Sequence, residues 1–257
     1  MKQKSYYKTS AVIILFVMFV MALTAMLMLG ACGSKDTSAS GGSTSGSGAS
    51  TSNPSDGTSS NSNAASGTSN TDAKGAYLSV LQGNTKFFSA DVGQDLSLSQ
   101  INQAVSADSS VTATVTKFAV IDLDRDGVQE CVLKLKVNND EDYGFMVLGY
   151  RSGKVYGYAF VYRVFNQVKA DGTFSFSSGA ADSGFGTISL NDTGFTMKQV
   201  TYSVSTTAAD GSVSIAYNVA QKASDKAAFD AAMAEQAAKP DVIWYSLTEG
   251  VAKAVLS

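Results

Sequence analysis

Apolar and polar positions divide the chain into three segments. Ala11–Leu29 is an apolar stretch without a charged residue, and it follows Lys2, Lys4 and Lys8. Residues 33–74 are mainly Ser, Gly, Thr, Asn and Ala, with no aromatic residue and no Leu, Ile, Val or Met. Such a segment cannot bury enough apolar surface to offset the entropy of ordering it, so we expect disorder there. Residues 75–257 mix apolar and polar positions throughout and are numerous enough for one domain with its own core.

Strand patterns fill the middle of the third segment. Apolar residues from Cys131 to Val137 alternate with Lys134 and Lys136, which predicts a strand with one buried face. Other apolar runs lie at residues 118–123, 143–150 and 155–165, and turn sequences containing Gly follow at 171–172, 191–194 and 210–211. Short connections between neighbouring strands predict an antiparallel meander. An aromatic row on one face of the fourth run predicts a core layer under a helix, and it comprises Tyr156, Tyr158, Phe160 and Tyr162.

Helix patterns lie at the two ends of the same segment. Near its start, Thr71-Asp72 can cap a helix that turns Tyr77, Leu78 and Leu81 inward, and a second helix is expected from Ser99 through Val105. Near its end, Ser224-Asp225 can cap an Ala-rich helix with Phe229 and Met233 inward, and Thr248-Glu249 can start a last helix through Val255. The predicted fold class is therefore α+β: a mostly antiparallel β-meander sheet with short N-terminal and C-terminal helices.

Composition excludes several kinds of site. The chain has no His, which rules out Ser-His-Asp and Cys-His catalytic arrangements and the usual zinc ligand. Three of its 19 basic residues precede Ala11, so the remainder carries 16 basic and 22 acidic residues, a net charge near −6. We therefore expect no nucleic-acid binding. Of the two Cys residues, Cys131 lies in a strand pattern and is expected to be a small buried residue.

One acidic constellation carries readable chemistry. Residues 122–130 follow the pattern D-x-D-x-D-G-x-x-E, with oxygen ligands at alternating positions and a Gly that permits a sharp bend. This spacing predicts a structural Ca²⁺ site. The expected ligands are the side chains of Asp122, Asp124, Asp126 and Glu130 and the main-chain carbonyl of Val128.

A plain hairpin turn is the alternative interpretation, because Asp-Gly between apolar runs favours a hairpin by itself. The turns at Asp171-Gly172 and Asp210-Gly211 serve as internal controls. Neither carries carboxylates two and four residues before its Asp, so hairpin formation does not require them. Carboxylates crowded on one loop repel each other unless a cation neutralises them, and this favours the metal site.

The leader predicts where the protein is located. Leu29-Gly30-Ala31-Cys32 closes the apolar stretch, and the Ser/Gly tract follows directly. This motif resembles the lipobox of bacterial lipoproteins, which implies cleavage before Cys32 and a lipid on its sulfur. An uncleaved transmembrane anchor is the alternative. The resulting organisation is a signal peptide at 1–31, the lipidated Cys and tether at 32–74, and one extracytoplasmic domain at 75–257.

The acidic loop resembles the strand-turn-strand calcium loops of FG-GAP and VCBS repeats. The combination of lipobox, Ser/Gly tether and this hairpin also resembles a group of Gram-positive surface lipoproteins. The resemblance implies calcium binding and a place on the outer face of the cytoplasmic membrane, but no particular activity. We expect a Ca²⁺-braced domain that binds cell-wall glycan or a surface protein. The alternative is a cell-wall-active hydrolase that uses a pair of carboxylates, as glycosidases do.

Overall fold

The computed structural model describes residues 69–257, which lie within one compact unit, Ala65–Ser257. The predicted leader, Cys32 and most of the predicted tether lie outside the described residues. The first helix, α2 (Asn70–Leu81), begins inside the segment that composition assigns to the tether. Within residues 69–257, no helix has both the length and the apolar character needed to cross a membrane.

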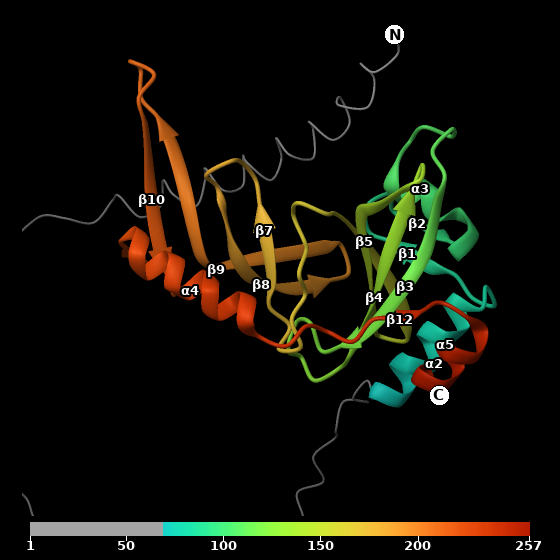
Figure 1. The fold of residues 1–257 in the computed structure, drawn as a ribbon. Helices are drawn as coiled ribbons and strands as arrows, with labels where there is room; N and C mark the ends of the chain where they lie inside the picture. Colours follow the sequence, from blue (N-terminus) through green and yellow to red (C-terminus); the bar gives the residue numbers. More distant parts are fainter. Residues whose placement is uncertain (1–68) are drawn as a thin grey trace, which may run out of the picture. The chain divides into compact units, whose positions relative to one another are not determined.

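The first of two sheets is built around a meander of four long strands (Figure 1). Its order is β12 (Tyr245–Ser246), β3 (Ala113–Ile121), β4 (Glu130–Val137), β5 (Asp140–Arg151), β6 (Lys154–Val161), β1 (Phe87–Ser89) and β2 (Gln94–Leu96). All neighbours are antiparallel except β1 and β6, which pair in parallel. The strand β12 comes from the far end of the chain and pairs with β3, so Tyr245 lies opposite Phe118.

Helices cover one face of this sheet. They are α2, α3 (Ile101–Val105), which follows the 3₁₀ turn η1 (Leu98–Gln100), and α5 (Glu249–Leu256). Their inward residues include Tyr77, Ile101 and Leu256, which join Phe118 and Leu133 of the sheet in one hydrophobic cluster. Helices α2 and α5 pack against each other although they lie at opposite ends of the described chain (Figure 1).

The second sheet covers the other face. Its order is β11 (Lys222–Ser224), β10 (Val213–Val219), β9 (Gly194–Thr207), β8 (Ser183–Asn191) and β7 (Phe174–Ser177), all antiparallel. Ile188 and Leu190 of β8 pack with Phe145 and Phe160 of the first sheet in a second cluster. Helix α4 (Lys226–Ala238) packs on β8, β9 and β10. The described chain is therefore mostly β, with antiparallel sheets and segregated helices, which is compatible with an α+β class.

Burial on both faces changes one strand prediction. The alternation in β4 predicts one buried face, but Glu130, Cys131, Val132 and Leu133 are all buried. Cys131 and Leu133 face the helices, whereas Val132 faces the second sheet. The polar alternation continues only at Lys134 and Lys136, which are half-buried and pair with Asp142 and Glu141.

The aromatic row of β6 is also placed differently. Tyr158 and Phe160 are buried, but they belong to the cluster between the sheets and not to a layer under a helix. Tyr162 lies beyond β6 and is 44% exposed. The Gly/Ser-rich stretch from Ser183 to Gly186 forms the start of strand β8.

The helices form where the sequence predicts them, but some of the residues that they turn toward the core differ from the prediction. Asp225 and Thr248 cap α4 and α5 through their side chains, as expected. Ser69, not Thr71, caps α2, because its hydroxyl accepts a hydrogen bond from the Asp72 amide. The helical period places Ala73, Tyr77 and Val80 on the face that enters the core, and Leu78 and Leu81 are half-buried beside it.

Candidate metal centre

The acidic loop is the connection between β3 and β4, from Asp122 to Gln129. Gly127 has a φ of 90°, a conformation that residues with a Cβ rarely adopt. The backbone conformation therefore explains why glycine occupies this position. Arg125 also has a positive φ, at 63°. These two residues turn the chain sharply enough to bring the start and end of the loop together.

Three carboxylates converge inside the loop. One oxygen each from Asp122, Asp124 and Glu130 lies within 4.8 Å of the other two. Such a group can hold a metal ion, because hard cations take several carboxylate oxygens at short distances. The Oδ1 atom of Asp122 is buried and has no hydrogen-bond partner. A buried carboxylate oxygen without a donor is costly unless a cation or water occupies the space beside it.

Main-chain amides of the loop hold the carboxylates in place. The Gly127 amide donates to Asp122 Oδ2 at 3.2 Å, and the Leu123 amide donates to Glu130 Oε2 at 2.8 Å. The Asp126 amide donates to Asp124 Oδ1 at 3.3 Å. Each of the three carboxylates is therefore oriented toward the interior of the loop by the backbone around it.

Burial makes this cluster electrostatically strained without a cation. Glu130 is 2% exposed, and burial raises the pKa of its carboxyl to about 8, with the charge of Asp124 as the next cause. Burial also raises the pKa of Asp124, and Asp126 adds to this. Both carboxylates are thus harder to ionise than an isolated acid, which is the expected signature of negative charges placed together in a partly dry site.

The protein supplies one cation of its own. Arg151, at the end of β5, donates from Nη2 to Asp124 Oδ2 at 2.5 Å and lies 3.6 Å from Asp126 Oδ2. The Leu190 amide of β8 donates to the same Asp124 oxygen at 3.3 Å. Asp124 therefore joins the loop to both sheets, and its Oδ2 is occupied while Oδ1 faces the loop backbone.

The predicted ligands fall into two groups. Asp122, Asp124 and Glu130 come together as described. Asp126 lies at the edge, where its Oδ1 accepts from the Val128 amide at 2.8 Å and its side chain is 40% exposed. The structure thus assembles three of the side-chain ligands, and the ligation by Asp126 and by the Val128 carbonyl stays a prediction.

Sequence reasoning missed three contacts to the loop. Arg151 and Leu190 reach it from other strands, and Asn70 reaches it from α2. Arg125, which we expected to face solvent, is exposed but also donates from Nη2 to the Asp171 carbonyl at 2.9 Å. All of these contacts join residues at least 27 positions apart in the chain, so no local motif could indicate them.

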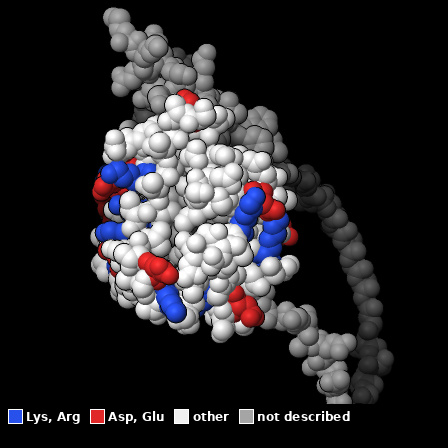
Figure 2. Space-filling model, turned by 90° about the vertical axis from the view of Figure 1, so that its right-hand side faces the viewer, with Lys and Arg blue, Asp and Glu red and all other residues white. Residues whose placement is uncertain are grey.

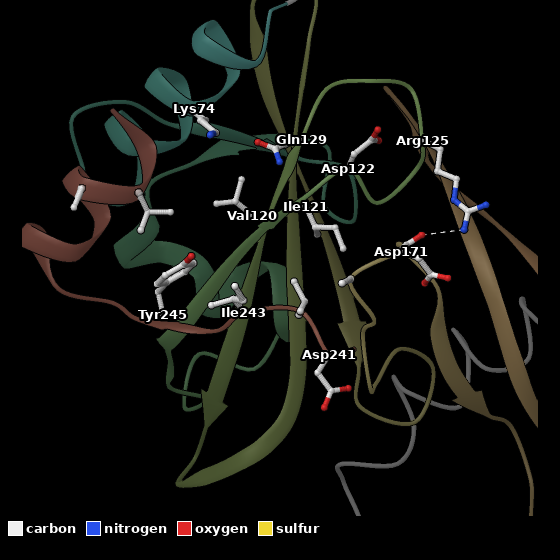
Figure 3. Close-up of a pocket in the computed structure, with 14 residues that line it drawn as sticks. Lys74, Val120, Ile121, Asp122, Arg125, Gln129, Asp171, Asp241, Ile243 and Tyr245 are labelled. Carbon is white, nitrogen blue, oxygen red and sulfur yellow. Dashed lines mark hydrogen bonds between the residues drawn. The ribbon is translucent and has the colours of Figure 1, made fainter. Parts of the chain in front are cut away.

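A groove of about 730 Å³ lies beside the loop (Figure 3). Val120, Ile121 and Ile243 form its apolar part, and Lys74, Gln129 and Arg125 lie around them. Ile243 is 68% exposed. The volume of the groove is in the range of small-ligand sites, and the groove combines an apolar surface with a few charged groups.

Charged residues are scattered elsewhere on the surface. Figure 2 shows one face on which blue and red residues stand together in small groups, with wide uncharged surface between them. Exposed ion pairs of the described residues include Lys154–Asp95, at 3.0 Å. Comparison with protein-family models, with curated proteins and with solved structures finds no match to this chain.

Proposed function

We propose that this chain is a lipid-anchored, extracytoplasmic binding protein whose domain is braced by one Ca²⁺ ion in the β3–β4 loop. The observation that carries the proposal is the convergence of Asp122, Asp124 and Glu130 oxygens within 4.8 Å around the bend at Gly127. Oxygen-only ligands favour Ca²⁺ over softer metals. Val128 and Asp126 complete the shell in this proposal, as they do in the FG-GAP and VCBS loops that the pattern resembles.

The contacts of Asp124 explain how a bound ion would stabilise the domain. That residue joins the loop to β5 through Arg151 and to β8 through Leu190. An ion on the loop would therefore stiffen the meeting point of both sheets. Extracellular calcium sites bind at roughly 0.1 to 1 mM, and tenfold excess over the dissociation constant adds about 1.4 kcal/mol of stability.

The place of action is proposed from the leader. The stretch Leu29-Gly30-Ala31-Cys32 supports cleavage and acylation at Cys32, which would hold the domain on the outer face of the cytoplasmic membrane. Incorporation of labelled palmitate into the wild-type chain, and not into Cys32→Ala, is the expected result. Equal labelling of both chains would refute the anchor.

Binding is the proposed role of the domain, with cell-wall glycan or a surface protein as the partner. The groove between Val120, Ile243 and Lys74 is the proposed contact surface. The alternative role is a carboxylate-based hydrolase, and the sequence offers two dense carboxylate clusters for it, the acidic loop and residues 139–142. However, Asp124 is already paired with Arg151, which suits an ion brace better than a proton-transfer pair.

The metal proposal is tested on the chain from Cys32 onward, with terbium luminescence and with melting curves. We expect ion uptake at millimolar concentration and a melting temperature about 3–6 °C higher in Ca²⁺ than in chelator. Asp124→Asn should abolish the difference. Asp210→Ala, at an exposed turn with no neighbouring carboxylate, is the matched control and should keep it. Identical wild-type melts in both buffers would refute the brace.

The choice between binding and hydrolysis needs a separate assay. Purified domain is incubated with cell-wall glycan and peptide, and the products are analysed by mass spectrometry. Retention of the domain on the glycan without new products supports the binding role. Turnover of any component would replace it with the hydrolase.

A further inference from the structure

Asn70 makes an unusual pair of hydrogen bonds to the acidic loop. Its Nδ2 donates to the Gly127 carbonyl at 3.1 Å, and its Oδ1 accepts from the Gln129 amide at 2.6 Å. The two bonds lie on either side of Val128. The side-chain amide therefore pairs with this backbone as a neighbouring strand would.

This pairing determines the direction of the Val128 carbonyl. The C=O and the N–H of one trans peptide unit point in opposite directions. The Gly127 carbonyl and the Gln129 amide point at Asn70, so the Val128 amide and the Val128 carbonyl, which belong to the same two peptide units, point away from it. The Val128 amide does so, because it donates to Asp126 Oδ1 at 2.8 Å. The Val128 carbonyl accordingly points away from Asn70.

Asn70 is held by a helix that does not depend on the loop. Ala73, Tyr77 and Val80 of α2 are fully buried, so the helix axis is fixed by the core. Ser69 caps its first turn, and the Ala73 amide bonds to the Ser69 carbonyl at 3.0 Å.

We infer that Asn70 is a positioning residue for the ion site: it aims the Val128 carbonyl at the cation and couples ion binding to the first turn of α2. The inference rests on the proposed calcium function. Because coupling between two sites is reciprocal, the ion must secure the first turn of α2 by the same factor by which Asn70 strengthens ion binding. The ion thereby controls how firmly the first turn of α2 is attached to the domain.

The test measures terbium and Ca²⁺ affinity of the chain from Cys32 onward, in wild type and in Asn70→Ala. Outer-shell partners of metal ligands commonly contribute tenfold or more to affinity. Asn70 is exposed and its bonds compete with water, so we expect binding about tenfold weaker in the variant. Asn84→Ala removes an exposed Asn whose side chain bonds only to Gln82 among the described contacts, and it should bind like wild type.

Hydrogen exchange supplies a readout that a merely structural role would not change. In wild type, saturating Ca²⁺ should slow exchange of the Asp72 and Ala73 amides by up to about tenfold. In Asn70→Ala this Ca²⁺ dependence should vanish. Asn70→Ser, which keeps a small polar side chain but cannot span both bonds, provides a second variant if the alanine form is poorly folded.

The outcomes separate the two proposals. Wild type that takes up no ion refutes the calcium site, and the role of Asn70 with it. Wild type that binds ion while Asn70→Ala and Asn70→Ser bind equally well overturns the inference alone. Weaker binding with an unchanged Ca²⁺ effect on Asp72 and Ala73 exchange would refute the coupling to α2.

Discussion

Replacing Arg151 with glutamine removes the guanidinium from the acidic loop and keeps a polar side chain in its place. The change isolates the protein's own counter-charge, since Arg151 bonds to Asp124 and lies near Asp126. We expect the variant to lose more stability without an ion than with one. The reason is that a bound divalent cation neutralises the same carboxylates and takes over part of the role of Arg151.

The magnitude follows from the burial of the pair. Asp124 is 4% exposed and Arg151 is 24% exposed at their side chains. Unit charges about 4 Å apart attract by about 4 kcal/mol at an effective dielectric constant of 20. Desolvation and the exposure of Arg151 offset much of this, which leaves a loss of about 2 kcal/mol without ion. With Ca²⁺ bound, we expect the loss to fall to about 1 kcal/mol.

Thermal melts in chelator and in Ca²⁺ test this difference. A domain of this size loses about 2–4 °C per kcal/mol, so Arg151→Gln should melt about 4–8 °C lower in chelator and about 2–4 °C lower in Ca²⁺. Linkage then requires Ca²⁺ to bind about fivefold more tightly to the variant. Arg151→Lys keeps the charge and should lie between the two. Equal losses in both buffers would show that Arg151 and the ion do not share the carboxylates.

Three further predictions concern other residues. Folding favours the protonated form of Glu130, whose pKa rises from 4.5 to about 8, so the ion-free protein should lose stability between about pH 4.5 and 8. Gly184→Ala would place its Cβ 2.1 Å from the Thr201 carbonyl and should cost about 2–3 kcal/mol in urea unfolding. Gly250→Ala, at an open position in α5, should add about 0.5 kcal/mol. Cys131 is fully buried, which raises the pKa of its thiol, so labelling by a thiol reagent should require unfolding.

For each of these three predictions, one experimental result would contradict it. Melting of Glu130→Gln in chelator should vary less with pH than wild type across that range, with the part due to Asp91, whose pKa burial raises to about 6, remaining. A slope equal to wild type would reassign the titration. Equal stability of the two glycine variants would contradict the close approach of β8 and β9 at Gly184. Fast labelling of Cys131 in native protein would mean that β4 opens locally.

Local signals in the sequence predicted the elements well. The caps Asp225 and Thr248 fix where α4 and α5 begin, because each supplies a side-chain oxygen to an otherwise unpaired amide. The turn at residues 151–154 connects β5 and β6 as expected. The sequence did not predict correctly which faces of the strands are buried. Nothing within β4 reveals that a second sheet covers Val132, since that sheet begins more than 40 residues later.

The ion site shows the same limit. Asp122, Asp124 and Glu130 are neighbours in the chain, so ligand spacing alone predicted that they converge. Asn70 and Arg151 come from distant positions and have no spacing relative to the loop that a motif could record. An Arg at a strand end and an Asn at a helix start are common, and only the tertiary fold brings them to one point.

The pairing of β12 with β3 has a consequence for the order of folding. Residues between Tyr245 and Leu256 close the helix-covered core, although its other members lie at or before Ala159. The whole second sheet must therefore be looped out before the last residues can dock, and closing so long a loop is entropically slow. A ribosome or translocon that releases this chain progressively would hold a first sheet without its edge strand β12, and with one face incompletely covered, until α5 emerges.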